Sequence, residues 1–402
     1  MTATRQADAP LDAAVEAVLP DALDLSHRVH AAPEIAFEER QASQWTAELL
    51  TRHGFEVTAP AGGLETAFVA RWQGERPGPV IAFAGEYDAL PEVGHGCGHN
   101  LMCSSSAGAA VAAAQTLGRD FGGEVRFIGT PAEEAGNGKV KLIAAGMFDD
   151  VDVCLQIHPS DRTSSEIACL AITEVGVTYR GKLAHASADP WLGKNALDAI
   201  VLLYTMVSQW RQHLKPGERV HGIITHGGAA PNIVPDLTSG RWYIRTPVDG
   251  DLEPMIDRFR QMAEAAATAT GCTVELTEDA TNRCRTMVNN PTLLGIWRGQ
   301  LAGAGWEDGP LDPNTGSTDM TNVSHVVPTI HPMMAIAPEG TPGHSREFAA
   351  HAGGEGGDGM LPVAIRVLAG SAVELLRNPT LVQQAWSELE THGGGRSRER
   401  AG

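Results

Sequence analysis

The sequence predicts an α/β fold with two domains: a larger domain built on a mixed sheet, and an inserted domain with the β-α-β-β-α-β order of a ferredoxin-like unit. Three observations support this prediction. The 402 residues exceed the roughly 250–300 at which one hydrophobic core stops growing. Strand-like and helix-like apolar patterns alternate over 1–175, and a different order of patterns occupies 176–286.

The larger domain is predicted to begin with residues 1–175. The expected helices lie at 11–25, 40–55 and 101–117, and the expected strands at 66–72, 79–91, 123–134 and 150–159. The helix at 101–117 is rich in Ala, Ser and Gly, small residues that allow close packing against a sheet. Polar residues follow the later strands, and open α/β sheets place their sites at such strand ends.

The inserted domain is predicted over 176–286. Its expected strands lie at 172–182, 219–228, 239–248 and 272–279, and its expected helices at 195–214 and 252–271. The chain then returns to the larger domain over 287–391. The remaining residues, 392–402, are rich in Gly and Arg and are predicted to form a disordered tail.

Composition restricts the classes of partner. The net charge of −19 argues against nucleic acid and anionic membranes, because binding phosphate requires clustered Lys and Arg. No run of about 20 apolar residues predicts a membrane span, and the first residues lack the pattern of a secretory signal. The six cysteines are scattered rather than densely spaced. We therefore expect a cytoplasmic protein that acts on a small molecule.

Metal-ligating side chains recur at strand ends and in Gly-rich turns. The candidates are Cys97 and His99 in GHGCGHN, Glu133 and Glu134 in GTPAEEAGNG, His158 in QIHP and His344 in TPGHS. Thiolate, imidazole and carboxylate together suit zinc, with manganese, cobalt or nickel as alternatives, and a thiolate can bridge two ions.

The adjacent glutamates have two interpretations. Neighbouring glutamates usually form a solvated face. Here Glu133 and Glu134 follow an apolar strand and a Pro and precede a Gly-rich turn. One can therefore bind metal while the other faces substrate and carries a proton, which is the division of roles that hydrolysis by a metal-activated water needs.

These motifs resemble the dinuclear-zinc aminoacylase and carboxypeptidase superfamily (peptidase family M-twenty), in the branch of p-aminobenzoyl-glutamate, hippurate and auxin-conjugate hydrolases. The similar stretches span almost the whole chain in order: LSHRVHAAPEIAFEE, GEYDALPEVGHGCGHN, GTPAEEAGNGKVKLIAAGMFDDVD, LQIHP, AHASADPWLGKNALDA, GGAAPNIVPD, GSTDMTNVS and GHS. The resemblance implies that the inserted domain is a lid that also forms a homodimer.

The resemblance also implies roles for individual residues. The implied ligands of two divalent ions are Cys97, His99, Glu134, His158 and His344, and Glu133 is the implied general base. His185, in LAHAS, would reach the partner's site and stabilise the oxyanion. Asn232 and Arg245 would hold the substrate carboxylate or the lid backbone, with a lid salt bridge as the alternative for Arg245. Asp88 would orient a ligand from behind.

The sequence departs from the motifs of this superfamily at two places, which leaves the number of metal ions open. Asn100 follows the Cys-Gly-His motif where many relatives carry Asp, so a charged partner behind the ligands is lost. Glu86-Tyr87-Asp88 stands where others in the wider family use a His-x-Asp pair. The remaining histidines that we considered are expected to be structural or to support ligands: His27, His30, His95, His226, His325 and His331.

The sequence therefore predicts a metal-dependent amidohydrolase that cleaves a small N-acyl amino acid or dipeptide-like substrate, with Glu133 as general base. Two alternatives stay open at this point. One is a hydrolytic deaminase that acts on the C–N bond of a small aromatic amino acid-type compound. The other is a catalytically inactive metal-binding protein, although the presence of Glu133 argues against it.

Overall fold

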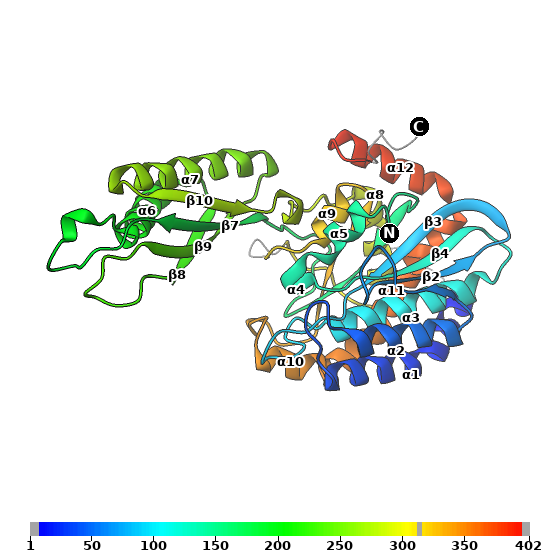
Figure 1. The fold of residues 1–402 in the computed structure, drawn as a ribbon. Helices are drawn as coiled ribbons and strands as arrows, with labels where there is room; N and C mark the ends of the chain where they lie inside the picture. Colours follow the sequence, from blue (N-terminus) through cyan, green and yellow to red (C-terminus); the bar gives the residue numbers. More distant parts are fainter. Residues whose placement is uncertain (1–7, 312–315, 396–402) are drawn as a thin grey trace. The chain divides into compact units, whose positions relative to one another are not determined.

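The computed structural model describes residues 8–311 and 316–395. The chain divides into two compact units, which we describe separately (Figure 1). Unit 1 comprises Met1–Ala168 and Met287–Gly402, and unit 2 comprises Cys169–Thr286. The first strand of unit 2 begins at Ala171, before the predicted domain start at residue 176.

Unit 1 contains a mixed sheet, six-stranded in the described residues, in the order β1-β2-β4-β3-β5-β11. Strands β3, β4, β5 and β11 pair in parallel, whereas β1 and β2 pair antiparallel at one edge. The strands are β1 (Glu56–Thr58), β2 (Phe68–Gln73), β3 (Arg76–Gly85), β4 (Gly122–Gly129), β5 (Val153–Leu155) and β11 (Thr329–Ile330). The predicted mixed sheet is confirmed. A separate parallel pair joins β6 (His158–Ser160) to β12 (Met333–Ala335).

The second half of β3 is buried on both faces, as expected of a strand inside the sheet. Ile81 and Phe83 face the larger core cluster, whereas Ala82 and Ala84 face a smaller one. Successive side chains of a strand point to opposite faces, so both faces of this sheet are covered. The end of β3 therefore leads directly from the core into the loop that carries Glu86 and Asp88.

Helices cover both faces of the sheet. The larger core is formed with α1 (Ala9–Ala31), α2 (Arg40–Arg52), α3 (His99–Leu117), α8 (Pro291–Gly303), α11 (Glu355–Arg377) and α12 (Pro379–Thr391). The smaller core is formed with α5 (Gly138–Ala144) and α9 (Met320–Ser324). Two short helices, α4 (Glu133–Gly136) and α10 (Arg346–Ala352), follow strand β4 and the GHS motif. Figure 1 shows α1, α2 and α3 stacked beside the sheet.

Helix α3 owes its close packing to small residues. A Cβ at Gly108 would lie 2.7 Å from the Cδ1 of Ile365 in α11. The Ala, Ser and Gly residues of α3 are buried up to Ala114, as expected for a helix enclosed on several sides. This packing fixes the N-terminus of α3, where His99 is the first helical residue.

Helix α11 is the one described helix that is long and apolar enough to cross a membrane by length and composition. Its most apolar window is 72% buried inside the structure. The helix packs against α1, α3 and α8, so the protein itself covers its apolar surface.

Unit 2 contains strands and helices in the chain order β7, α6, β8, β9, α7 and β10. Its antiparallel sheet, four-stranded in the described residues, has the order β10-β7-β9-β8. The elements are β7 (Ala171–Arg180), α6 (Ala196–Trp210), β8 (Arg219–His226), β9 (Leu237–Thr246), α7 (Asp249–Thr270) and β10 (Thr273–Glu278). Side chains of β7 alternate between buried and half-buried, because α6 and α7 cover one face. Unit 2 therefore has a hydrophobic core of its own.

The predicted tail begins directly after α12. Gly395 donates a backbone hydrogen bond to the carbonyl of His325. Residues 396–402, most of the predicted tail, lie outside the described residues.

Candidate metal centre

The Cys97 loop and the start of α3 depend on a glycine. Gly98, between Cys97 and His99, has φ +80°, and a Cβ there would lie 2.8 Å from the Cγ of Pro159. A side chain at this position would be strained and would also clash. Gly98 thus allows the Cys97 loop to pass close to β6, which begins with His158.

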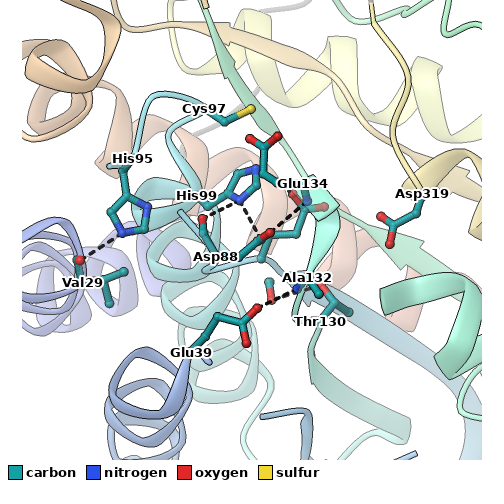
Figure 2. Close-up of polar contacts among 12 residues, drawn as sticks. Val29, Glu39, Asp88, His95, Cys97, His99, Thr130, Ala132, Glu134 and Asp319 are labelled. Atoms are coloured by element: carbon teal, nitrogen blue, oxygen red, sulfur yellow. Dashed lines mark hydrogen bonds and ion pairs between the residues drawn. The ribbon is translucent and has the colours of Figure 1, made fainter. Parts of the chain in front are cut away.

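The turn that carries the two glutamates is held by two other carboxylates (Figure 2). Ala132 has φ 61°, and its N–H donates to Oε1 of Glu39 at 2.8 Å. The N–H of Glu134 donates to Oδ2 of Asp88 at 2.9 Å. The two hydrogen bonds stabilise the left-handed backbone conformation of Ala132, which is unfavourable for a residue other than glycine. They thereby fix the direction of α4, which begins with Glu133.

His158 and His344 reach the same region from other elements. His158 begins β6, and its register partner is Met333 on β12. His344 adopts φ 57°, and its N–H donates to the carbonyl of Gly96 at 2.9 Å. The Cys97 loop thereby holds the backbone of His344.

The side chains form two groups of possible ligands that share Cys97. Cys97, His99 and His158 form one group, and Cys97, Glu134 and His344 form the other, with ligand atoms within 4.8 Å of one another in each. The Sγ of Cys97 lies 3.3 Å from Nε2 of His158. Oε1 of Glu134 lies 3.5 Å from Nε2 of His344. A thiolate that belongs to both groups is placed to bridge two ions.

Asp88 determines which nitrogen of His99 faces the centre. Nδ1 of His99 lies 2.9 Å from both Oδ1 and the carbonyl oxygen of Asp88. Both partners are acceptors, so Nδ1 carries a hydrogen and Nε2 is the nitrogen available for a metal. Burial disfavours a charged imidazole, but the Asp88 carboxylate outweighs it and raises the pKa of His99.

The remaining groups suit a divalent cation. Nε2 of His99 and Oε1 of Glu134 are buried, and within the described part of the chain neither forms a hydrogen bond of ordinary geometry. Burial lowers the pKa of His158 to about 4, which keeps its imidazole neutral, and raises the pKa of the Cys97 thiol. A nearby cation would reverse the effect on Cys97, since metal coordination deprotonates a thiol. The residues present therefore fit a thiolate-bridged metal centre.

Glu133 lies beside this centre. It forms a further group with Glu86 and His99, with ligand atoms within 4.8 Å of one another. Burial and the neighbouring carboxylates, Glu86 first among them, raise the pKa of Glu133 well above its usual range. A half-buried carboxyl at such a position can exchange a proton with a molecule bound in the centre.

A buried ion cluster behind the centre was not predicted from the sequence. Nζ of Lys139 lies 2.6 Å from Oε1 of Glu86 and 2.6 Å from Oδ1 of Asp319, and all three side chains are almost fully buried. Burial favours a neutral carboxyl at Glu86, but the Lys139 ammonium lowers its pKa. The available signals were the acidic residue that follows β3 and the Asp of GSTDM, yet nothing in the sequence pairs them with Lys139.

Several other predicted residues bind structural partners. Nδ2 of Asn100 donates to Oγ of Ser26 and to the carbonyl of Ala352, which ties α3 to α1 and α10. Nε2 of His95 lies 3.0 Å from the carbonyl oxygen of Val29. The expectation that Asn100 supports a metal ligand stays a prediction.

In unit 2, His185 lies beside Asn232. Strand-like pairing joins His185 to Ile233, and the N–H of Ala186 donates to the carbonyl of Asn232. Nδ1 of His185 accepts the N–H of Ala188 at 3.1 Å. Its Nε2 therefore carries the hydrogen of the neutral ring, and this exposed imidazole can donate a hydrogen bond.

Arg245 lies on β9 with its guanidinium 5.6 Å from the centre of the Tyr243 ring. Its Nε is buried, and in the described residues it has no hydrogen-bond partner. Burial lowers the pKa of Arg245. The alternative of a lid salt bridge gains no support from these contacts.

Comparisons with known proteins agree with the motifs. Residues 82–369 match the family described as Peptidase family M20/M25/M40. The Xaa-Arg dipeptidase of Mus musculus is 38% identical over 386 residues, which cover 91% of this chain and 88% of that protein. One of the subunits of the p-aminobenzoyl-glutamate hydrolase of Escherichia coli (strain K12) is 36% identical over 304 residues, which cover 70% of this chain and 62% of that protein.

A solved structure shows the same fold. The crystal structure of a Bacillus subtilis protein, described as a dinuclear metal binding peptidase from the M20 family, matches with a TM-score of 0.66 and 20% identity. The match covers 90% of this chain and 99% of that one. The resemblance inferred from the motifs is confirmed: the chain belongs to peptidase family M20/M25/M40 and is a metallohydrolase that acts on carbon–nitrogen bonds.

Proposed function

We propose that the protein hydrolyses the amide bond of small N-acyl amino acids or dipeptides, with Cys97, His99, Glu134, His158 and His344 as metal ligands and Glu133 as general base. The observation that carries this proposal is the pair of ligand groups that share Cys97, with Glu133 next to them. The relatives named Xaa-Arg dipeptidase and p-aminobenzoyl-glutamate hydrolase support this substrate class.

The ligand set favours zinc, with manganese, cobalt or nickel as alternatives, and the shared thiolate favours two ions. When bound, such ions supply an activated water and polarise the substrate carbonyl. Cys97, His99 and His158 would hold one ion, and Cys97, Glu134 and His344 the other. Asp88 would keep His99 oriented through its Nδ1.

Glu133 then moves the proton that the reaction requires. It accepts a proton from the attacking water as the water oxygen bonds to the carbonyl carbon. It then donates this proton to the leaving nitrogen as the C–N bond breaks. The Nε2–H of His185 donates a hydrogen bond to the carbonyl oxygen, which gains negative charge in the transition state.

We assign unit 2 the role of a ferredoxin-like lid that carries substrate-binding groups. The pairing of the His185 and Asn232 segments supports a shared role in binding. Arg245 has a half-buried guanidinium whose Nε has no hydrogen-bond partner among the described residues, which suits it to a substrate carboxylate.

The lid also has a surface suited to a second copy of the chain. Strand β8 is an edge of its sheet, and on it Ile223 is 63% and Ile224 38% exposed. Val201 and Tyr204 of α6 are exposed as well. An uncovered edge with apolar side chains tends to pair with another chain, so we assign the homodimer interface to this part of unit 2. In that dimer, each centre would receive the partner subunit's His185.

The strongly negative net charge supports a small-molecule substrate rather than nucleic acid or an anionic membrane. We also propose a cytoplasmic location for the enzyme.

The proposal is tested by removing the metal and by a substrate panel. Dialysis against a strong chelator should abolish hydrolysis, and added zinc, manganese or cobalt should restore it. The panel contains dipeptides that end in Arg, p-aminobenzoyl-glutamate and other N-acyl amino acids, and product amines and ammonia are measured separately. Full activity of metal-free protein would contradict the proposal. Release of ammonia from aromatic amino acids without any amide hydrolysis would instead indicate a deaminase.

A further inference from the structure

Glu86 lies at the end of β3 with its two carboxylate oxygens in different environments. Oε1 lies 2.6 Å from Nζ of Lys139, whereas Oε2 lies 3.2 Å from Nε2 of His99. The side chain of Glu86 is fully buried, so water does not compensate either oxygen. Each of the two oxygens therefore requires a partner inside the protein.

Lys139 is fixed independently of Glu86. Its Nζ donates to Oδ1 of Asp319 at 2.6 Å, and its backbone N–H donates to Oδ2 of the same residue at 2.8 Å. An ammonium held in this way occupies one oxygen of Glu86 and directs the other toward His99. The orientation of Glu86 is thus set before any ligand binds.

Glu86 and His99 face each other without an ordinary hydrogen bond, because Oε2 of Glu86 and Nε2 of His99 are both buried and have no hydrogen-bond partner among the described residues. Nδ1 of His99 carries a hydrogen because both of its partners on Asp88 are acceptors. In the neutral ring, Nε2 is then a bare lone pair that faces a carboxylate oxygen. A positive charge at this point, either a proton on Nε2 or a bound metal ion, would satisfy both atoms, which lie 3.2 Å apart.

The spacing is that of two ligands of one ion. Metal–nitrogen and metal–oxygen bonds of about 2.0–2.2 Å in a tetrahedral site place neighbouring ligand atoms about 3.3–3.5 Å apart. The Oε2–Nε2 distance of 3.2 Å is close to this value. Glu86, His99 and Glu133 form a possible ligand group that shares His99 with the group of Cys97 and His158.

We propose that Glu86 is an additional ligand, through Oε2, of the ion that His99 binds, and that Lys139 is the residue that positions it. The inference rests on the proposed metal centre. It makes the two ions unequal, because Glu86 does not belong to the possible ligand group that contains Glu134 and His344. Loss of the Glu86 carboxylate should therefore weaken the binding of one ion and leave the binding of the other unchanged.

The test compares metal binding by Glu86→Gln, Glu134→Gln and wild-type protein, each as the full chain loaded with Zn²⁺. Bound zinc per chain is measured by mass spectrometry after dialysis, and affinity is measured by competition with a chromogenic chelator. Glu86→Gln should lower the affinity for one of the two zinc ions at least about 10-fold. Even residues that only orient a ligand typically contribute about 10–100-fold to metal affinity. Lys139→Met should lower the affinity for the same zinc ion to a smaller extent. Lys139→Arg, which keeps the positive charge, should lose less affinity than Lys139→Met.

Glu124→Gln is the matched control. Glu124 is also a buried carboxylate bound to a buried cation, with its Oε1 2.6 Å from Nε of Arg126, but it lies on β4 outside the ligand groups. This variant should bind zinc as wild type does. An equal loss in Glu124→Gln and Glu86→Gln would show a general effect of breaking a buried pair and would overturn the inference.

Two outcomes separate this inference from the proposed function. If Glu134→Gln loses zinc and Glu86→Gln does not, the inference is wrong and the proposed centre stands. If neither variant loses zinc, the proposed ligand set is wrong as well. Should Glu86→Gln fail to fold, the crystal structure of zinc-loaded wild type decides: a Glu86 oxygen about 2.0–2.2 Å from the ion supports the inference, and one beyond about 3 Å overturns it.

Discussion

One carboxylate oxygen of Asp88 binds Nδ1 of His99 at 2.9 Å, while its other oxygen accepts the backbone N–H of Glu134 at 2.9 Å. His99 and Glu134 belong to different groups of possible ligands. A single buried side chain therefore fixes one member of each group, and Figure 2 shows Asp88 between them. The alignment of both groups depends on this one residue.

We expect Asp88→Asn to weaken metal binding about 10- to 100-fold, the usual effect of losing a group that orients a ligand. In Asn, an NH2 donor replaces one of the two carboxylate oxygens and would face either Nδ1–H of His99 or the N–H of Glu134, so one of the two hydrogen bonds is lost. Chelator competition measures the effect. The control is Asp152→Asn, which removes a carboxylate that accepts the N–H of Val80 in the same sheet. Equal metal affinity in Asp88→Asn and wild type would contradict the assigned role.

Glu133 and Glu134 should respond differently to the same substitution. Glu133→Gln should keep its metal while kcat falls by roughly two to four orders of magnitude, the scale of losing a general base. Glu134→Gln should lower metal occupancy. Metal analysis and kinetics on the same preparations check both expectations, and the reverse pattern would exchange the two roles.

His185 should act from the partner subunit. Mixing inactive Glu133→Gln with inactive His185→Ala should restore activity in heterodimers, because one of the two centres then has both groups intact. Mass spectrometry or fluorescence must show that the subunits exchange. If they exchange and activity stays at background, His185 acts within its own chain or is structural.

The salt bridge between Arg126 and Asp150 should make stability depend on acid pH. The Arg126 guanidinium donates to both oxygens of Asp150, at 2.6 and 2.9 Å, and lowers the pKa of Asp150 below its ordinary 3.8. A lowered pKa means that the bridge stabilises the fold above pH 3.8 and that this contribution is lost as pH falls through the folded pKa.

Asp150→Asn should therefore unfold at lower urea concentration than wild type at pH 7 and pH 5. The difference between the two midpoints should shrink below pH 4. The side chain of Asp150 is exposed, so the effect should be modest. A difference that stays constant down to pH 2 would show that the carboxylate charge does not cause it.

The sequence was sufficient for the elements whose residues repeat regularly. Alternating burial along β7 and the apolar spacing of α6 and α7 follow from local pattern, and the observed bounds lie close to the predicted ranges. The candidate ligands could also be predicted from the sequence, because each stands at the end of an apolar strand or in a Gly-rich turn. Parallel strands bring such ends together at one edge of a sheet.

The buried ion cluster of Lys139, Glu86 and Asp319 could not be predicted from the sequence, and the reason is physical. A lysine is almost always exposed unless it is paired, and the pairing of Lys139 with Glu86 and Asp319 joins residues from three distant stretches. Periodicity reports which face of an element is buried, but it does not report which charges meet. The tautomers of His99 and His185 likewise depend on contacts that only the folded chain creates.

The ends of unit 2 meet each other within that unit. Ile172, near its start, pairs with Cys284, near its end, through hydrogen bonds between their backbones. A segment whose two ends are adjacent can be exchanged for another such segment, because the distance between the two junction points in the surrounding chain stays nearly the same. Under the substrate-binding role proposed for unit 2, chimeras with junctions before Ile172 and after Cys284 would combine the metal-binding chemistry of one family member with the selectivity of another. Such a division would let new substrates evolve without altering the catalytic residues.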